Sequence, residues 1–398
     1  MLDKNMELVF LTVVISLGCV ALLLFLQWKN LQGPPCIRGW IPWIGAGFEF
    51  GKAPLEFIEK ARIKYGPIFT VFAMGIRMTF VTEEEGINVF LKSKEVNFEL
   101  AVQNPVYRTA SIPKNIFLAL HEKLYITMKG KLGTTNLRQF TGQLTEELHE
   151  QLDHLGTHGT MDLNNLVRHL LYPVSVNMLF KKGLFPTNKR KTMEFYQNFE
   201  AYDEGFEHGS QMPEFLLRNW SKSKSWLLAF FEKNIPDIKA YKSEKDNSMT
   251  LMQALLDIIE IETNEKSPNY GLLLLWASLS NAVPNYTVPS GDLLMLSPFW
   301  LHRNPKYFPE PELFKPERWK KANLEKHAFL DSFMAFGSGK YQCPGRWLAL
   351  LEIEICIILF FYYYDCSLLD PLPKQSSLHL LGVQQPEGQC QIEYKRRK

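Results

Sequence analysis

The sequence predicts a mostly α-helical protein with a small β region, preceded by one membrane-spanning helix. Three observations support this class. Residues 8–26 form a run of 19 residues without a charge, most later segments repeat apolar residues every three or four positions, and only two segments are rich in β-branched and aromatic residues. The 398 residues are 46% hydrophobic, which supplies a buried core and excludes a disordered or fibrous chain.

The first element is a predicted membrane anchor. At about 1.5 Å per residue, residues 8–26 nearly span a hydrocarbon layer of about 30 Å. The alternative is a cleaved signal peptide, but its apolar core would be shorter and would end at a small-residue cleavage site. The run ends instead in Gln-Trp-Lys-Asn at residues 27–30, an interfacial aromatic residue with a cation. We therefore predict a retained anchor, residues 1–30, followed by one body, residues 31–398.

The charge and cysteine content of the chain exclude some kinds of binding site and favour one cellular compartment. Lys and Arg number 44 against 42 Asp and Glu, so the net charge is +2 and no nucleic-acid-binding footprint is present. The six cysteines lie far apart, without a CxxC pair or a Cys/His spacing typical of zinc. We interpret them as reduced, which favours a body that faces the cytosol.

Secondary structure follows from the spacing of apolar residues. Helices are predicted at residues 56–65, 140–155, 161–180, 189–209, 250–263, 270–282 and 346–364. A β-hairpin is predicted at residues 68–80 around Gly75, and a strand pair at residues 286–296 around a Pro-Ser-Gly-Asp turn.

Three further segments are less regular. Residues 211–228 are apolar and aromatic but contain a basic Ser/Lys stretch, and we favour a buried helix pair over a second membrane-contacting surface. Residues 240–247 form a charged linker. Residues 304–319 are rich in proline and are predicted to be irregular.

The strongest functional signal is the segment 336–345, with the sequence FGSGKYQCPG. Backbone without side chains near Gly339 and Gly345 lets a flat ligand approach the sulfur of Cys343. We expect nearby amides and the start of the following helix to hold this cysteine as a thiolate. A thiolate on haem iron donates electron density and favours O–O cleavage. The alternative is a buried free cysteine, which is the interpretation given to Cys356.

With this segment, nearly the whole chain resembles the cytochrome P-450 superfamily. The matching stretches are KYGPI at 64–68, HRNP at 302–305, FPEP at 308–311 and FKPERW at 314–319, besides the anchor and the Gly-Pro-Pro at 33–35. The resemblance implies the mostly helical P-450 fold around haem b, with Cys343 as the axial iron ligand. It implies electrons from NADPH through NADPH–cytochrome P-450 reductase. The haem-binding residues implied are Phe336, Gly339, Tyr341, Cys343 and Gly345.

The expected distal helix narrows the resemblance to the sterol-hydroxylase branch. Near Ala277, Ser280 stands where most members carry an acid, and Asn281 stands where they carry an oxygen-activating Thr. An Asn amide still donates a hydrogen bond, so these three residues are the catalytic candidates. This branch implies 7α-hydroxylation of an oxysterol, 24-hydroxycholesterol, in cholesterol breakdown to bile acids at the endoplasmic reticulum membrane.

The residues expected near the haem propionates also depart from the family pattern. Most members place Arg or His where this chain has Tyr341, and a tyrosine supplies one hydrogen bond without a charge. His121, Lys129 and Lys131 are alternative propionate partners, although an ordinary solvated helix face is favoured for them.

One family element is missing. Members carry a Glu-x-x-Arg helix before the Pro-rich stretch, but here Pro284 runs directly into residues 285–291. We interpret the chain as a shortened, alternatively spliced form, and the match at Glu59 and Arg62 as chance. Arg318 is then expected to lose a buried ionic partner, at a cost of about 3–5 kcal/mol. The deleted helices are also expected to leave apolar surface uncovered.

Three functions remain open. The first is an oxysterol monooxygenase that uses haem, O2 and NADPH. The second is a haem-poor membrane protein without catalysis, and the third is a prostacyclin-synthase-like haem isomerase that needs no reductase. We expect the first for the family and impaired activity for this particular chain.

Overall fold

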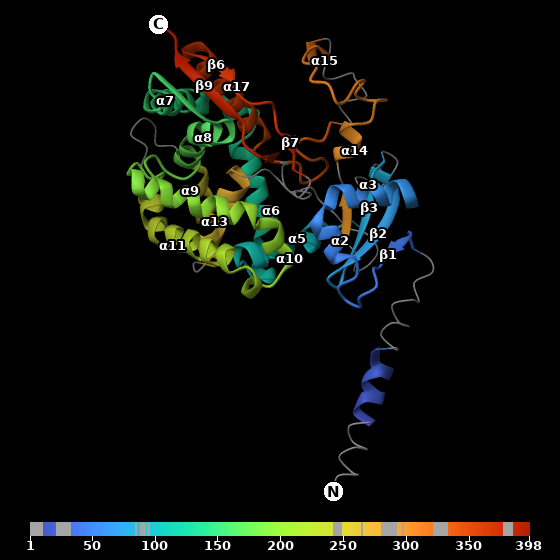
Figure 1. The fold of residues 1–398 in the computed structure, drawn as a ribbon. Helices are drawn as coiled ribbons and strands as arrows, with labels where there is room; N and C mark the ends of the chain where they lie inside the picture. The colour runs from blue at the N-terminus through green and yellow to red at the C-terminus, as the bar shows by residue number, and fades with distance from the viewer. Residues whose placement is uncertain are drawn as a thin grey trace. The chain divides into compact units, whose positions relative to one another are not determined.

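A computed structural model describes residues 11–20, 33–83, 86–87, 93, 96–241, 249–263, 266–279, 293–296, 298–320, 333–376 and 385–398. The chain divides into two compact units, each formed by segments far apart in sequence (Figure 1). Unit 1 contains Met1–Val96 and Tyr286–Phe333, and unit 2 contains Asn97–Asn285 and Met334–Lys398. The prediction of one catalytic domain over residues 31–398 stays a prediction.

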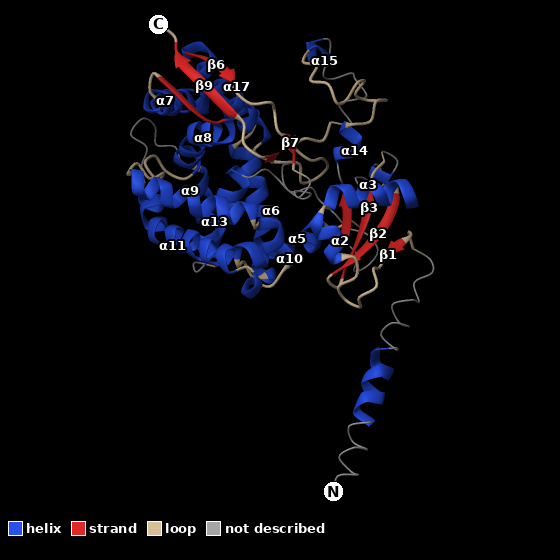
Figure 2. Cartoon of the chain, in the orientation of Figure 1, coloured by secondary structure: helices blue, strands red, loops and turns tan. Residues whose placement is uncertain are grey.

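Unit 1 is built on a four-stranded sheet (Figure 2). Its order is β1 (Cys36–Ile37), β2 (Ile68–Ala73), β3 (Ile76–Val81) and β5 (Leu293–Leu296). The middle pair is antiparallel and the two outer pairs are parallel. Helices α2 (Gly47–Lys52) and α3 (Pro54–Tyr65) pack against β2, and two short helices, α14 (Pro298–His302) and α15 (Glu317–Lys320), follow β5.

The predicted hairpin at residues 68–80 is confirmed. Ala73 pairs with Ile76, so Met74 and Gly75 form a two-residue turn with φ of 51° and 78°. Two positive φ values are typical of a type I′ turn, whose twist matches the flanking strands. The sequence therefore sets the register of this hairpin locally.

Unit 2 is the helical part of the protein (Figure 2). Its helices are α5 (Phe98–Ala110), α6 (Lys114–Lys131), α7 (Leu137–Leu155), α8 (Leu163–Leu179), α9 (Lys189–Glu204), α10 (Phe206–Gln211), α11 (Arg218–Ala240), α12 (Leu251–Glu262), α13 (Ser267–Leu279) and α17 (Arg346–Tyr363). One large hydrophobic core joins most of them. An antiparallel sheet, β4 (His158–Asp162), β9 (Gln391–Arg396) and β6 (Tyr364–Leu368), and a short pair, β7 (Lys374–Gln375) with β8 (Pro386–Glu387), complete the unit.

Most predicted elements are confirmed, with three differences. The segment 189–209 is two helices, separated at Gly205. The buried helix pair predicted at 211–228 is wrong: a 3-10 turn, Glu214–Leu216, leads into the single helix α11. The reason is that the Ser/Lys stretch continues the helix, with Lys224 buried inside. Only the last four residues of the strand pair predicted at 286–296 are described, and they form β5.

The predicted membrane anchor lies largely outside the described residues. Residues 11–20 are helical, and their side chains are exposed. Among the residues that the structure describes, no helix has the length and apolar character needed to cross a membrane.

Candidate functional site

The cysteine segment folds as a closed loop at the start of α17. The Cys343 amide donates to the Phe336 carbonyl at 3.0 Å, which closes the loop across its base. Gly337 and Gly339 turn the chain with φ of 70° and 74°, a region that disfavours side chains. A Cβ added at Gly337 would meet no atom within 4 Å, so this side of the loop is open.

The surroundings of the Cys343 sulfur contain the backbone amides and the helix start that the sequence predicts. Helix α17 begins at Arg346 with Gly345 at its N-cap, and the backbone amides of both residues lower the pKa of the Cys343 thiol. Burial nevertheless raises the pKa of the Cys343 thiol above its ordinary value, and these amides only partly offset it. The expectation that amides and helix alone hold a thiolate is therefore wrong. A bound cation, such as the iron of a haem, is the kind of group that deprotonates a coordinating thiol.

Helices α5 and α6 hold the loop from one side. The hydroxyl of Tyr125 donates to the Gln342 carbonyl at 2.8 Å. The hydroxyl of Tyr341 donates to Glu99 Oε1 at 2.9 Å, and His121 Nδ1 lies 3.1 Å from the same oxygen. Burial raises the pKa of Glu99, but the hydrogen bonds from His121 and Tyr341 bring it below its ordinary value. Glu99 is thus an ionised carboxylate held by two of the residues proposed for a haem propionate.

This arrangement fits a haem. The donors at the loop already hold a carboxylate, which is the chemical group of a propionate. Sequence reasoning did not find Glu99, because it lies 242 positions before Tyr341 and belongs to a helix that was not predicted. Burial lowers the pKa of His121, more than Glu99 raises it, so this ring is mostly neutral at pH 7.

The other predicted residues have different outcomes. The structure brings together the five haem-loop residues, Phe336, Gly339, Tyr341, Cys343 and Gly345. Ala277 is exposed on α13, and Ser280 and Asn281 lie outside the described residues. Lys129 and Lys131 lie in the last turn of α6, where cations complement the helix dipole; Lys129 is exposed and Lys131 is half-buried.

The Arg318 prediction is wrong. Its guanidinium is not buried without partners, because it donates to the carbonyls of Pro309, Glu310 and Leu313 at 3.0 to 3.3 Å. The cost expected for an unpaired buried charge therefore does not apply.

The Glu-x-x-Arg match in the first helix forms an ordinary helical ion pair. Arg62 Nη2 lies 2.8 Å from Glu59 Oε1 within α3, and the indole of Trp300 donates to the same carboxylate. Both partners belong to unit 1, whereas the cysteine loop belongs to unit 2.

Helix α17 exposes an apolar face, as the missing helices predict. Its opposite face packs into the core through residues such as Leu348 and Phe360. The outward side chains are between 37% and 69% exposed; they are Trp347, Leu350, Ile353, Ile357, Ile358, Phe361 and Tyr362. We call these seven residues the α17 face. The exposed Glu354 lies among these residues, and the rest of this face is apolar. A large exposed apolar face is rare on a folded monomer and marks a surface that another segment usually covers.

Comparisons with known proteins agree with the site. The family model described as Cytochrome P450 matches residues 34–267 and 277–393. The 24-hydroxycholesterol 7-alpha-hydroxylase of Homo sapiens is 69% identical, over 98% of this chain and 100% of that protein. The Mus musculus protein of the same name is 61% identical, over 98% and 99%. A solved structure, retinoic acid bound cyanobacterial CYP120A1, has a TM-score of 0.65 at 17% identity, covering 92% of this chain and 99% of that one.

The match to the human protein also shows how many of its positions are missing from this chain. It runs over 468 positions, 70 more than the 398 residues of this chain. At least that many positions of the human protein therefore have no counterpart here. The sequence predicts a shortened chain of this kind, and the place of the missing segment after Pro284 stays a prediction.

Proposed function

The chain belongs to the cytochrome P450 family, and on this premise we propose that it is an oxysterol 7α-hydroxylase acting on 24-hydroxycholesterol. The observation that carries the proposal is the 69% identity to the human enzyme of that name, along nearly the whole chain. The net reaction inserts one oxygen atom of O2 into the C–H bond at position 7. The other oxygen leaves as water, with two electrons from NADPH and two protons.

Cys343 is the residue that we assign to the haem iron. What supports it is the closed loop from Phe336, the open side at Gly337 and the two backbone amides that lower the pKa of its thiol. When bound, the haem supplies the activation of molecular oxygen. His121 and Tyr341 are donors of the right kind for a propionate, since they already hold the Glu99 carboxylate.

Three residues of the distal segment are assigned by resemblance. The side-chain amide of Asn281 and the hydroxyl of Ser280 donate hydrogen bonds on the oxygen side, and the small side chain of Ala277 leaves room there. We place the protein in the endoplasmic reticulum membrane, anchored by residues 8–26, with its body in the cytosol. NADPH–cytochrome P-450 reductase is the proposed electron donor.

A second candidate is a haem-poor product of the same gene that turns over slowly. Two observations favour it: the exposed α17 face and the 70 positions without a counterpart. No observation favours the isomerase alternative. Activity that does not require NADPH would identify it.

The test uses the purified full chain with reductase and lipid. Haem per mole of chain, the reduced CO difference spectrum and 7α-hydroxylated product from 24-hydroxycholesterol are measured together. NADPH-dependent product supports the hydroxylase. A thiolate spectrum without product from this sterol would contradict 24-hydroxycholesterol as the substrate. Absence of both the thiolate spectrum and the product would support the haem-poor candidate.

A further inference from the structure

The peptide bond that precedes Cys343 is hydrogen-bonded at both of its ends. On one side, the Tyr125 hydroxyl of α6 donates to the Gln342 carbonyl at 2.8 Å. On the other side, the Cys343 amide, which belongs to the same peptide unit, donates to the Phe336 carbonyl at 3.0 Å. The carbonyl and the amide of a trans peptide point in opposite directions, so the two hydrogen bonds fix one rigid plane from opposite sides.

The orientation of this peptide plane sets the direction of the sulfur. Rotation of the plane changes ψ of Gln342 and φ of Cys343, and the side chain of Cys343 turns with that φ. Neither angle changes widely unless one of the two hydrogen bonds breaks. A peptide whose carbonyl accepts a hydrogen bond also becomes a stronger N–H donor, so the bond from Tyr125 strengthens the one that closes the loop. The Tyr125 hydroxyl therefore acts on the sulfur through the backbone.

Tyr125 is itself held in a fixed position. It lies inside the long helix α6 and is only 8% exposed. Its ring meets the Tyr341 ring edge-on, with centroids 5.3 Å apart and an interplanar angle of 78°. Burial raises the pKa of Tyr125, so its hydroxyl keeps its proton at neutral pH and remains a donor. A buried ring on a long helix presents this donor at one place.

Two further contacts from α5 and α6 reach the loop, and both hold side chains. Glu99 accepts the hydrogen bond of the Tyr341 hydroxyl, and Glu122 pairs with the Lys340 ammonium at 2.9 Å. Contacts of this kind fix the ends of flexible or rotating side chains and leave the peptide plane free to turn. The hydrogen bond from Tyr125 differs from them because it holds the backbone next to the cysteine.

We propose that Tyr125 is a positioning residue for Cys343, which fixes the direction of the sulfur through the Gln342 peptide and limits the opening of the loop. The inference rests on the proposed function in one respect, the assignment of Cys343 to the haem iron. Residues that hold a metal ligand in its orientation contribute to metal affinity although they do not touch the metal. A residue that only stabilises the fold has no such effect on the ligand.

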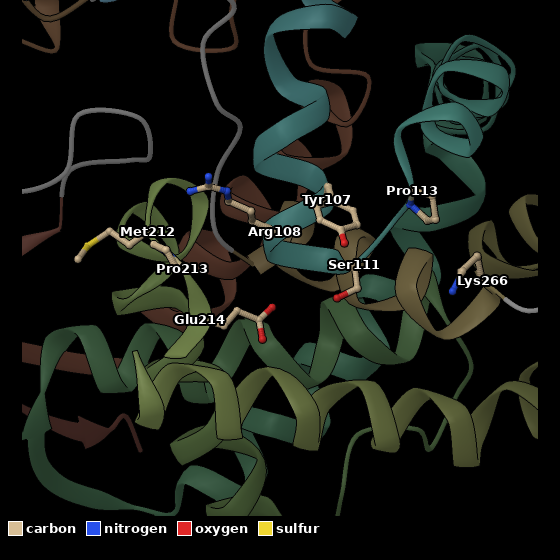
Figure 3. Close-up of a pocket in the computed structure, with 8 residues that line it drawn as sticks. All are labelled: Tyr107, Arg108, Ser111, Pro113, Met212, Pro213, Glu214 and Lys266. Carbon is tan, nitrogen blue, oxygen red and sulfur yellow. The ribbon is translucent and has the colours of Figure 1, made fainter. Parts of the chain in front are cut away.

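Two variants separate positioning from stability. Tyr125→Phe removes the hydroxyl and keeps the ring. Tyr202→Phe is the matched control, because Tyr202 is 1% exposed and its hydroxyl donates to the Thr109 carbonyl at 3.0 Å. Both variants remove one hydrogen bond of the same kind, so we expect a similar loss of stability. Thr109 lies about 15 Å along α5 from Glu99. Figure 3 shows this end of α5, and none of the residues that line the pocket there belongs to the loop 336–345.

The first measurement uses the full chain before haem is added. Alkylation of Cys343 by iodoacetamide at one pH is followed by mass spectrometry of its peptide. A half-buried thiol reacts when its surroundings open, so the rate reports how often the loop opens. Cys343 should react about fivefold faster in Tyr125→Phe than in the unsubstituted chain, which is the effect of one net hydrogen bond. Its rate in Tyr202→Phe, and the rate of Cys356 in all three chains, should not change.

The second measurement uses the same three chains loaded with haem. The thiolate band of the reduced CO complex should disappear about fivefold faster in Tyr125→Phe than in Tyr202→Phe. Equal alkylation in Tyr125→Phe and the unsubstituted chain, an equal effect of both variants, or equal persistence of the band would overturn the proposal. An unsubstituted chain without any thiolate band would contradict the proposed role of Cys343, and the alkylation rates would still decide whether Tyr125 holds the loop.

Discussion

Cys343 lies between opposing influences, since burial raises the pKa of its thiol while the amides of Gly345 and Arg346 lower it. The residue is built to bind a cation and is not ionised by its surroundings alone. Sequence reasoning found this residue because the whole loop is contiguous: its glycines, its cross-loop hydrogen bond and the following helix lie within about a dozen positions. It could not find Glu99, since only the folded chain brings α5 to the loop.

Replacing Cys343 with Ala should abolish the thiolate-haem spectrum of the reduced CO complex. No other described residue shares the loop geometry that supports the assignment. Cys356 is the matched control, because it lies on α17, where burial, and then the nearby Glu352, raise its pKa to about 12. Cys356→Ala should keep the spectrum. A Cys343→Ala chain that retained the thiolate band would exclude Cys343 as the ligand.

Glu99→Gln should bind haem at least about fivefold more tightly. The carboxylate of Glu99 holds Tyr341 and His121, and its negative charge opposes a propionate there, by about 1 kcal/mol for exposed charges a few ångströms apart. The dissociation constant comes from titrating haem into the apo-protein and following the Soret absorbance. Glu122→Gln is the control, since Glu122 forms an ion pair with the exposed Lys340 and does not hold Tyr341. Weaker haem binding by Glu99→Gln would show that Glu99 positions the donors instead of competing for them.

At the scale of elements, α17 begins where the haem loop ends and has one core face and one exposed face. Its core side carries Glu352, whose carboxylate accepts a hydrogen bond from Ser175 on α8. Burial raises the pKa of Glu352 to about 7, and the Ser175 hydrogen bond only partly opposes this. The protonated form of Glu352 therefore contributes to the free energy of unfolding. Its contribution is fully present below the ordinary pKa of 4.5 and is lost as the pH rises through about 7.

Glu352→Gln should stabilise the protein at pH 8 and leave it unchanged at pH 5. Glutamine keeps a partner for Ser175 but does not ionise, so about 1–2 kcal/mol of unfolding free energy should be regained at the higher pH. Urea denaturation at both pH values measures it. Glu354→Gln, an exposed change on the same helix, should show no such pH dependence. An equal effect of Glu352→Gln at both pH values would contradict the assigned protonation state.

The elements that the sequence predicted well are those with strong local signals. The apolar run of α17, the type I′ turn after β2 and the Thr250 capping box of α12 each specify their structure over a few residues. Helix α5 was missed, because its apolar residues alternate with Gln, Asn and Pro and the core selects its buried side only after folding. Helix α6 was expected only as the helix that carries His121, Lys129 and Lys131. The residues that directly follow Leu279, the last residue of α13, lie outside what the structure describes.

At the scale of the molecule, the missing segment affects packing more than ion pairing. Sequence reasoning located the deletion by comparison with the family pattern and predicted two consequences. The prediction that Arg318 is left unpaired is wrong, because backbone carbonyls in its own loop accept its hydrogen bonds in place of a distant partner. The prediction of exposed apolar surface agrees with the α17 face, which lies on the helix that follows Cys343. A short loop supplies enough carbonyl groups to bind one guanidinium. It cannot cover an apolar face that extends along a whole helix.

The deletion therefore leads to a prediction about the whole enzyme. Restoring the segment that the human relative carries should raise haem occupancy and increase 7α-hydroxylation of 24-hydroxycholesterol at least about a hundredfold, equivalent to about 2.7 kcal/mol. Covering four of the seven side chains of the α17 face supplies that much, because each is about half exposed and gains about half of the roughly 1.5–3 kcal/mol for full burial of a large apolar side chain. A supported distal helix adds to this, since a displacement of about 1 Å in a group such as Asn281 costs about a hundredfold.

The comparison is made between the two forms, each expressed with reductase, by measuring haem per mole, product formation and binding of a hydrophobic dye. The restored form carrying Cys343→Ala controls for product that does not come from the haem. Dye binding should fall in the restored form, because the α17 face is covered whether or not haem is present. Equal haem occupancy with rates within about tenfold, a difference of about 1.4 kcal/mol, would show that the segment is dispensable. Reduced dye binding without a gain in rate would instead assign the deficit to the distal helix, since the packing of α17 would then have been repaired and the chemistry would not.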